Sequence, residues 1–469
     1  MNHSNRNVSI GLYGRRYSLP AWPTPAVAFT LAFAAALLVA LTQAPKYFYY
    51  DSGDYWSVGE TFVSHGDFSL SNYASPLRGY LLPLTYHGLH GLARALRWSD
   101  SSAVKIFNAL LLALIATVLA PKLAEATWPE RAWSASRRLA LLALLLIFWS
   151  GYLNFPLSDI PGLAVALAAI VVMSWPCSAR SMLLAGAAIA AAVDVRPSYI
   201  LLLAALPLLA LLDLRGRPDR RRHAVRLPLY LGLAVASFAL VSLPQSLAMH
   251  RHFRTYSFIP GAPEELESLQ LGNGMELQLY GTYVGTGHAP EMNYPDATGA
   301  ALLARQSLRQ LNSTKYLELV LENPPTFAGI FARHLVNGLD LRYSTPYVER
   351  LSADWWLRVG GFLLVFIALL RVLWPRARRG LGKALWRYAV TLFACGATAL
   401  PSAVETRYML PLFVLCYLLV LTPGWPSPLP AGRTAPWVRY RAVAIILLGG
   451  LAFTGVVWHV VSATSATFQ

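Results

Sequence analysis

Cysteine and charged residues are both scarce in this sequence, and each shortage excludes a class of protein. The three cysteines, Cys177, Cys395 and Cys416, have neither paired nor metal-ligand spacing, so we expect no disulfide framework. Only 13% of residues are charged and 56% are hydrophobic, which is too apolar for an ordinary soluble domain. The composition therefore predicts a protein embedded in a lipid bilayer.

Acidic residues are also outnumbered, with 23 Asp and Glu against 39 Lys and Arg and a formal net charge of +16. In a soluble protein this excess would suggest a nucleic-acid partner. Here the arginines lie mainly in short loops between apolar runs, where such residues set the orientation of membrane helices. We therefore expect no nucleic acid as a partner.

About eleven apolar runs approach the roughly 20-residue length of a transmembrane helix. They predict an all-α polytopic membrane protein, with residues 24–469 forming one transmembrane domain after a cytoplasmic tail, residues 1–23. The run pairs around Asp159 and Arg196 could each be one long broken segment. The predicted helices lie near residues 24–44, 103–120, 139–156, 160–175, 182–194, 197–212, 228–246, 355–372, 384–401, 408–422 and 441–461.

The distribution of arginine predicts the orientation of these helices. With a cytoplasmic N-terminus, the dense basic clusters in the loop 213–226 and at Arg376, Arg378 and Arg379 fall on the cytoplasmic side, as the positive-inside rule requires. An odd number of spans then places the C-terminus outside. We expect the protein in the plasma (inner) membrane.

Two segments, 45–102 and 247–354, are too long to be turns, and both become extracytoplasmic loops. An apolar face over 79–96, and apolar residues every four positions from Phe327 to Leu339, predict helices that lie along the membrane surface or the bundle. The glycine-rich run from Gly272 to Gly287 predicts a mobile loop that closes over substrate.

Charged residues near the ends of the predicted spans collect on the outer side. A charge at the centre of a membrane helix costs about 2.5 to 3.5 kcal/mol on insertion scales, so each one needs a reason. Any single residue could cap a helix at the headgroup level, but together they predict a polar cavity. The set comprises Asp51, Asp54, Arg78, Asp159, Asp194, Arg196, Glu405 and Arg407.

Short motifs occur in a fixed order along this outer layer. They are YYDSGDY at 49–55, HGDF at 65–68, RGYLLP at 78–83, LSDIP at 157–161, RP at 196–197 and ETRYMLP at 405–411. In order and sidedness they resemble the GT-C glycosyltransferases, polytopic enzymes that include protein O-mannosyltransferases and the aminoarabinose transferases of lipid A. Two departures are Gly79, where these proteins often have proline, and the lack of an adjacent Asp-Glu pair, which leaves the catalytic acid open between Asp51 and Asp54.

The resemblance implies a cell-envelope enzyme, an inverting hexosyl- or pentosyltransferase. Its partners would be a polyprenyl-phosphate-linked sugar, an extracytoplasmic lipid, glycan or protein acceptor, and the bilayer. The loop 45–102 would be catalytic, and the loop 247–354 would recognise substrate or acceptor.

A role follows for each candidate residue. Asp51 is favoured over Asp54 as the base that takes the proton of the acceptor hydroxyl. Asp159 could orient the acceptor, ligate a divalent metal or cap a helix. The donor phosphate and substrate would be bound by Arg78, Arg196, Glu405, Arg407 and Tyr408. Arg407 could instead pair with Glu405 or reach the membrane interface.

Two rival functions share these residues. Polar groups inside a helical bundle also mark the substrate pathway of a transporter or flippase for lipid-linked glycans. The lack of a detectable two-fold repeat, and of inner loops comparable to the outer ones, disfavours that interpretation. A polysaccharide polymerase or ligase would share the outer side and the lipid donor.

Overall fold

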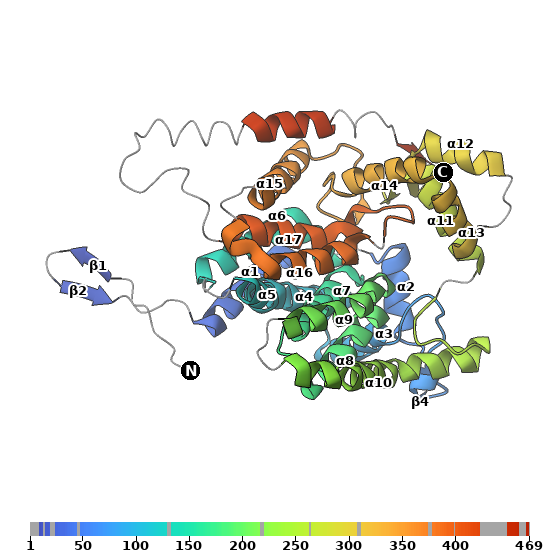
Figure 1. The fold of residues 1–469 in the computed structure, drawn as a ribbon. Coiled ribbons are helices and arrows are strands. Elements are labelled where there is room, and N and C mark those ends of the chain that lie inside the picture. The colour runs from blue at the N-terminus through green and yellow to red at the C-terminus, as the bar shows by residue number, and fades with distance from the viewer. Residues whose placement is uncertain are drawn as a thin grey trace.

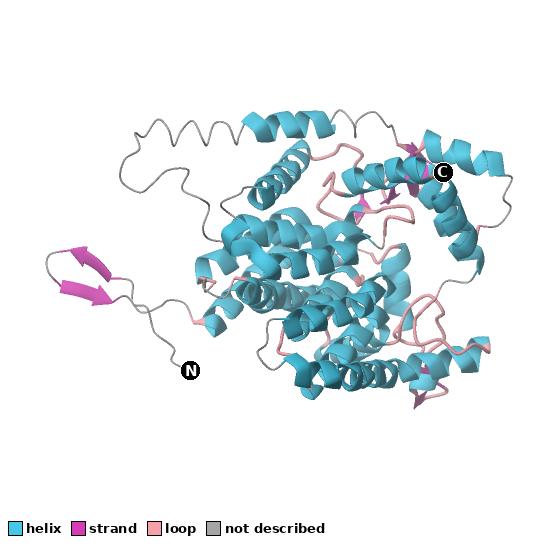
Figure 2. Ribbon diagram, in the orientation of Figure 1, coloured by secondary structure: helices cyan, strands magenta, loops and turns pink. Residues whose placement is uncertain are grey.

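A computed structural model describes residues 9–12, 15–18, 24–44, 47–128, 133–215, 220–261, 264–306, 311–373, 378–397, 399–422, 448–458 and 466–468. Helices dominate these ranges and strands are few (Figure 2). Of the predicted tail, residues 1–8, 13–14 and 19–23 lie outside the described residues. The rest forms an antiparallel hairpin that was not predicted, β1 (Ser9–Leu12) and β2 (Arg15–Ser18).

Six helical segments among the described residues are long and apolar enough to cross a membrane. They contain α1 (Pro25–Thr42), α4 (Asp100–Leu114) with α5 (Ala120–Thr127), α6 (Ala135–Trp149), α9 (Leu201–Arg215), α10 (Arg220–Phe253) and α15 (Trp355–Leu373). Other helices of the bundle are α7 (Asp159–Met173), α8 (Ala179–Val195), α16 (Arg378–Ala397), α17 (Leu410–Leu421) and the segment Leu448–Trp458. The structure is thus mainly helical, with apolar segments compatible with a helical membrane protein, while the count of eleven spans stays a prediction.

Small residues let these helices approach closely (Figure 1). The alanines of α1 at 28, 32, 36 and 40 are buried one above another, and α1 packs on α4. A Cβ at Gly186 of α8 would overlap the backbone of Ala234 and the hydroxyl of Ser237 in α10. The α8–α10 contact therefore depends on glycine at this position.

The segment predicted to be the first outer loop folds onto the bundle through an amphipathic helix. The loop contains α2 (Tyr50–Val58), the hairpin β3 (Val63–Ser64) and β4 (Asp67–Phe68), and α3 (Leu81–Leu96). The apolar face predicted for 79–96 is present in α3, where Leu82, Tyr86 and Ala93 are buried. This face packs against α2, α4 and α8.

The segment 247–354, predicted to be the second outer loop, gathers at one end of the bundle (Figure 1). Its helices are α11 (Glu264–Glu276), α12 (Ala297–Gln306), α13 (Ser313–Glu322) and α14 (Pro324–Gly338). Its strands are β5 (Leu277–Tyr283), β6 (Glu291–Pro295) and β7 (Tyr347–Val348), which with β8 (Thr467–Phe468) form a sheet of order β7-β5-β6-β8. The β5–β6 and β6–β8 pairs are antiparallel and the β5–β7 pair is parallel.

Two features of this segment differ from the expectation. The fold is mainly helical, but it also contains the four-stranded sheet, which was not predicted. The glycine-rich run, predicted to be a mobile loop, is only partly a loop: Gly272 and Gly274 lie in α11 and Gly281 in β5, whereas Gly285 and Gly287 lie in the β5–β6 connection. A Cβ at Gly274 would overlap the carbonyl of Pro401, and one at Gly281 would press on Met292, so these glycines permit close packing.

The β6–β8 pairing should be detectable by cross-linking. Met292 and Phe468 are directly opposite in the ladder, so the variant M292C/F468C should form a disulfide under mild oxidation. The matched control E291C/F468C should cross-link poorly, because successive side chains point to opposite faces of a sheet. Equal yields from the two pairs, read on non-reducing gels, would contradict this register.

Candidate active site

The eight residues that were assigned to catalysis or to binding of the donor phosphate and substrate lie on four well-separated parts of the chain. They meet at one end of the helices. Asp51 and Asp54 belong to α2, and Arg78 lies just before α3. Asp159 begins α7, and Arg196 follows α8. Glu405, Arg407 and Tyr408 lie at the 3₁₀ turn that precedes α17. Each of them contacts another member of the set in one connected network.

Arg407 is the centre of this network. Its Nη2 donates to Asp51 Oδ2 at 2.9 Å and to Glu405 Oε1 at 2.7 Å. Its Nη1 lies 3.9 Å from Asp159 Oδ2. The pairing with Glu405 that the sequence left open is therefore present, together with two further acids.

Arg78 completes one side of the network. Its Nη2 donates to Asp51 Oδ1 and to Asp54 Oδ2, both at 3.1 Å. The guanidinium carbon lies 4.0 Å from the ring centroid of Tyr55, in a cation–π contact. Asp51 is thus held between two guanidinium groups, whereas Asp54 has one and is more exposed, at 66% against 45%.

Asp159 and Arg196 complete the other side. Arg196 Nη1 donates to Asp159 Oδ1 at 2.6 Å, and the Asp159 side chain is only 2% exposed. Ser158 occupies the N-cap position of α7, so Asp159 serves as an ion-pair partner rather than as the cap residue. Tyr408 donates its hydroxyl to Glu405 Oε1 at 2.7 Å and places its ring 5.0 Å from the Arg196 guanidinium.

The network has more acids than cations, with four carboxylates against three guanidinium groups. Burial alone would raise the pKa of the Asp51 carboxyl, but the charges of Arg407 and Arg78 outweigh burial and lower that pKa to about 2. Asp51 is therefore ionised at neutral pH and has little affinity for a proton in this arrangement. A further anion can bind in this network only if an arginine breaks its ion pair with a carboxylate and pairs with the anion instead.

A clamp formed by Tyr73, Gly79 and Asp194 fixes the backbone that carries Arg78. The Tyr73 hydroxyl bonds the carbonyls of Arg78 and Gly79 at 2.6 and 3.1 Å. Asp194 Oδ1 accepts from the amide of Leu81 at 2.7 Å. A Cβ at position 79 would overlap the Asp194 backbone carbonyl and carboxylate, which explains glycine in this chain. Sequence reasoning noted Asp194 without a role and missed Tyr73, which no motif distinguishes.

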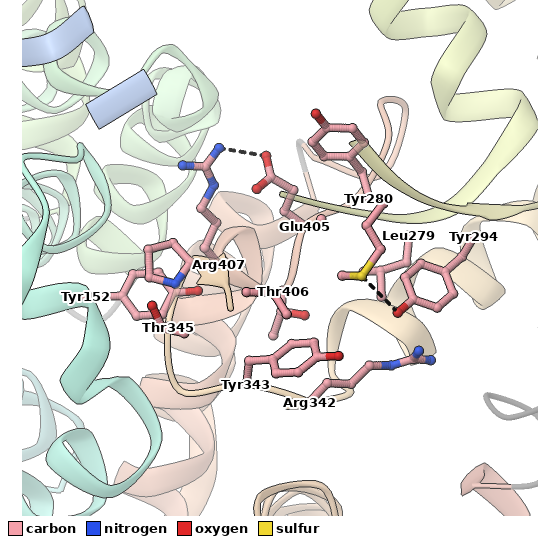
Figure 3. Close-up of a pocket in the computed structure, with 14 residues that line it drawn as sticks. Tyr152, Leu279, Tyr280, Tyr294, Arg342, Tyr343, Thr345, Glu405, Thr406 and Arg407 are labelled. Carbon is pink, nitrogen blue, oxygen red and sulfur yellow. Dashed lines mark hydrogen bonds and ion pairs between the residues drawn. The ribbon is translucent and has the colours of Figure 1, made fainter. Parts of the chain in front are cut away.

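A pocket beside the network was also missed. It contains about 440 Å³ of space, including its opening to solvent, and is lined by β5, β6, residues 342–348 and residues 405–407. Figure 3 shows Arg407 and Tyr152 on one side and Tyr294 on the other. Its tyrosines come from separate segments, so only the tertiary fold reveals them.

Among the described residues, no three His, Cys, Asp or Glu side chains are grouped to hold a metal ion. A scan against protein-family models gives no match, and a search of curated proteins gives none. The argument for function therefore comes from the geometry of the site and the order of its motifs.

The clamp can be tested without a substrate. Tyr73→Phe removes the hydroxyl that the carbonyls of Arg78 and Gly79 share, so local opening of residues 78–81 should become about fivefold more frequent. Hydrogen–deuterium exchange of the Leu81 amide in the full-length protein measures this. The control Tyr80→Phe removes a bond to Val241 instead and should leave the Leu81 amide protected by Asp194. Equal exchange in both variants would contradict the clamp.

Proposed function

We propose that the protein is a membrane glycosyltransferase of the GT-C type, which transfers a sugar from a polyprenyl-phosphate carrier to an extracytoplasmic acceptor. The supporting observation is that two arginines from distant segments, Arg78 and Arg407, converge on the partly exposed carboxylate of Asp51. A base beside phosphate-binding cations is the combination that this reaction needs. The orientation follows from the arginine-rich loops: N-terminus in the cytoplasm, C-terminus outside.

The reaction can be written with these residues in named roles. The acceptor hydroxyl gives its proton to Asp51, and its oxygen forms a bond to the anomeric carbon of the sugar. The bond between that carbon and the phosphate oxygen breaks, and its electron pair stays on the lipid phosphate. Arg78 and Arg407 stabilise the charge that grows there, because fixed cations stabilise a developing anion without reorganisation.

Donor binding would also prepare the base. While both arginines bind Asp51, its pKa near 2 makes it a weak proton acceptor. A lipid phosphate that draws Arg78 and Arg407 toward itself weakens the two interactions that lower this pKa. Burial, which raises the pKa, then dominates, so the carboxylate becomes a better base when the donor is in place.

The geometry favours an enzyme over a flippase. Asp51, Asp159, Arg196 and Arg407 all lie at helix ends or in the connections between helices, on one side of the bundle. Alternating-access transporters place their substrate groups near the bilayer midplane. A polymerase or ligase with the same donor differs in its product, so the length of the product distinguishes it.

Replacement of the base gives the first functional prediction. Asp51→Asn should lower turnover about 10²- to 10⁴-fold, because the amide cannot accept the proton. Turnover is measured in proteoliposomes with a panel of polyprenyl-phosphate sugars. Asp67→Asn, a change at an exposed acid of the same loop, should keep normal turnover. Normal turnover in Asp51→Asn, at equal membrane abundance, would contradict the assignment, and net lipid translocation without any transfer would indicate a flippase.

The pH dependence gives a second prediction. The Asp51 pKa of the free enzyme lies near 2, so the acidic limb of kcat/KM from this residue should fall below about pH 3. If the donor takes the arginines, the pKa in the complex is higher and protonation removes the base sooner. The acidic limb of kcat should therefore lie at higher pH than that of kcat/KM. Coincident limbs would show that donor binding leaves the ion pairs of Asp51 intact.

A further inference from the structure

The pocket next to the ion network shares residues with it. Glu405, Thr406 and Arg407 line the pocket, and Arg407 also binds Asp51. A ligand whose charged group lies at Arg78 and Arg407 can therefore extend into the pocket without leaving the site.

The walls of the pocket combine aromatic rings with hydrogen-bonding groups. Tyr152, Tyr280, Tyr294 and Tyr343 all line it, and each offers a flat apolar face with a hydroxyl at one end. Glu405 uses only its Oε1 for Arg407 and Tyr408, which leaves Oε2 without a hydrogen bond from the described residues. The Glu405 side chain is 11% exposed and lines the pocket, so this oxygen suits a ligand that carries hydroxyl donors.

The charges of the wall disfavour other ligands. Arg342 is engaged by Asp340 at 2.6 Å and lies over the ring of Tyr294. Arg407 pairs with Asp51 and Glu405 and, in the proposed reaction, takes the donor phosphate, so neither cation is left for an anion inside the pocket. A lipid tail would cover Glu405 Oε2 without giving it a hydrogen bond, at a cost of about 1 to 3 kcal/mol.

We propose that this pocket binds an uncharged sugar ring, stacked on its tyrosines with hydroxyls donated to Glu405. The proposal rests on the proposed glycosyl transfer and specifies where one of its two sugars is held. The ring belongs either to the donor or to a glycan acceptor, and both present the same chemistry to these walls.

The binding test uses the full-length protein in nanodiscs and saturation-transfer NMR. The probes are the methyl glycosides of glucose, mannose, galactose and arabinose, with farnesyl phosphate as the lipid-like rival. At least one glycoside should receive saturation. Tyr280→Leu and Tyr343→Leu, as two independent variants checked by thermal melting, should each weaken its binding about tenfold.

The control is Tyr256→Leu, an exposed tyrosine stacked on His250 at the end of α10. It should leave glycoside binding unchanged. The proposal would be overturned if no glycoside received saturation, or if all three variants bound the glycoside equally. It would also be overturned if only the prenyl chain of farnesyl phosphate received saturation and the pocket variants lost that signal.

A competition experiment separates the two sources of the sugar. Polyprenyl phosphate carrying the same sugar should displace the glycoside if the pocket takes the donor ring. If the pocket takes the acceptor ring, the glycoside should stay bound when polyprenyl phosphate is added, either without a sugar or carrying the same sugar. Failure of the whole donor panel to turn over would reject glycosyl transfer, whereas loss of glycoside binding with turnover intact would reject only the pocket.

Discussion

The guanidinium of Arg407 is the interaction on which the site depends. It contacts Asp51, Asp159 and Glu405, so it joins the segment after α1, the start of α7 and the turn before α17. These contacts constrain the topology, because residues that meet lie on the same side of a membrane. The chain between each pair must therefore cross the membrane an even number of times. The predicted spans number two between Asp51 and Asp159, two between Asp159 and Arg196, and four between Arg196 and Arg407, so the prediction meets this condition.

The unit formed by α11 to α14 and the four-stranded sheet fixes the position of the turn that carries Arg407. The ring nitrogens of His334 in α14 lie 2.6 and 2.8 Å from the carbonyls of Leu400 and Leu277. The amide of Tyr280 in β5 donates to the carbonyl of Val404, next to Glu405. The unit that would recognise substrate therefore also holds the charged turn, so movement of the sheet would change the geometry of Glu405 and Arg407.

The charged residues of the site could be predicted from the sequence because charges at the ends of apolar helices are expensive and therefore rare. Their shared sidedness was sufficient to group Asp51, Asp159, Arg196 and Arg407, although not to show which acid binds which arginine. The sheet was not predicted: β5 and β6 do alternate polar and apolar residues, but only over seven and five residues, and two glycines of the glycine-rich run belong to α11. Tyr73 and the pocket tyrosines were missed because their roles depend on contacts between distant segments.

The excess of one carboxylate explains why such a network fits a catalytic site better than a structural one. A buried ion-pair network stabilises a fold only when its charges and hydrogen bonds are matched, and unmatched charges cost stability. Here Asp159 Oδ2 and Arg407 Nε lack hydrogen-bond partners, although both atoms are buried. A fold under selection for stability alone would replace this arrangement with apolar packing, whereas a site that must exchange a carboxylate for a phosphate needs cations that are held in place but not fully satisfied.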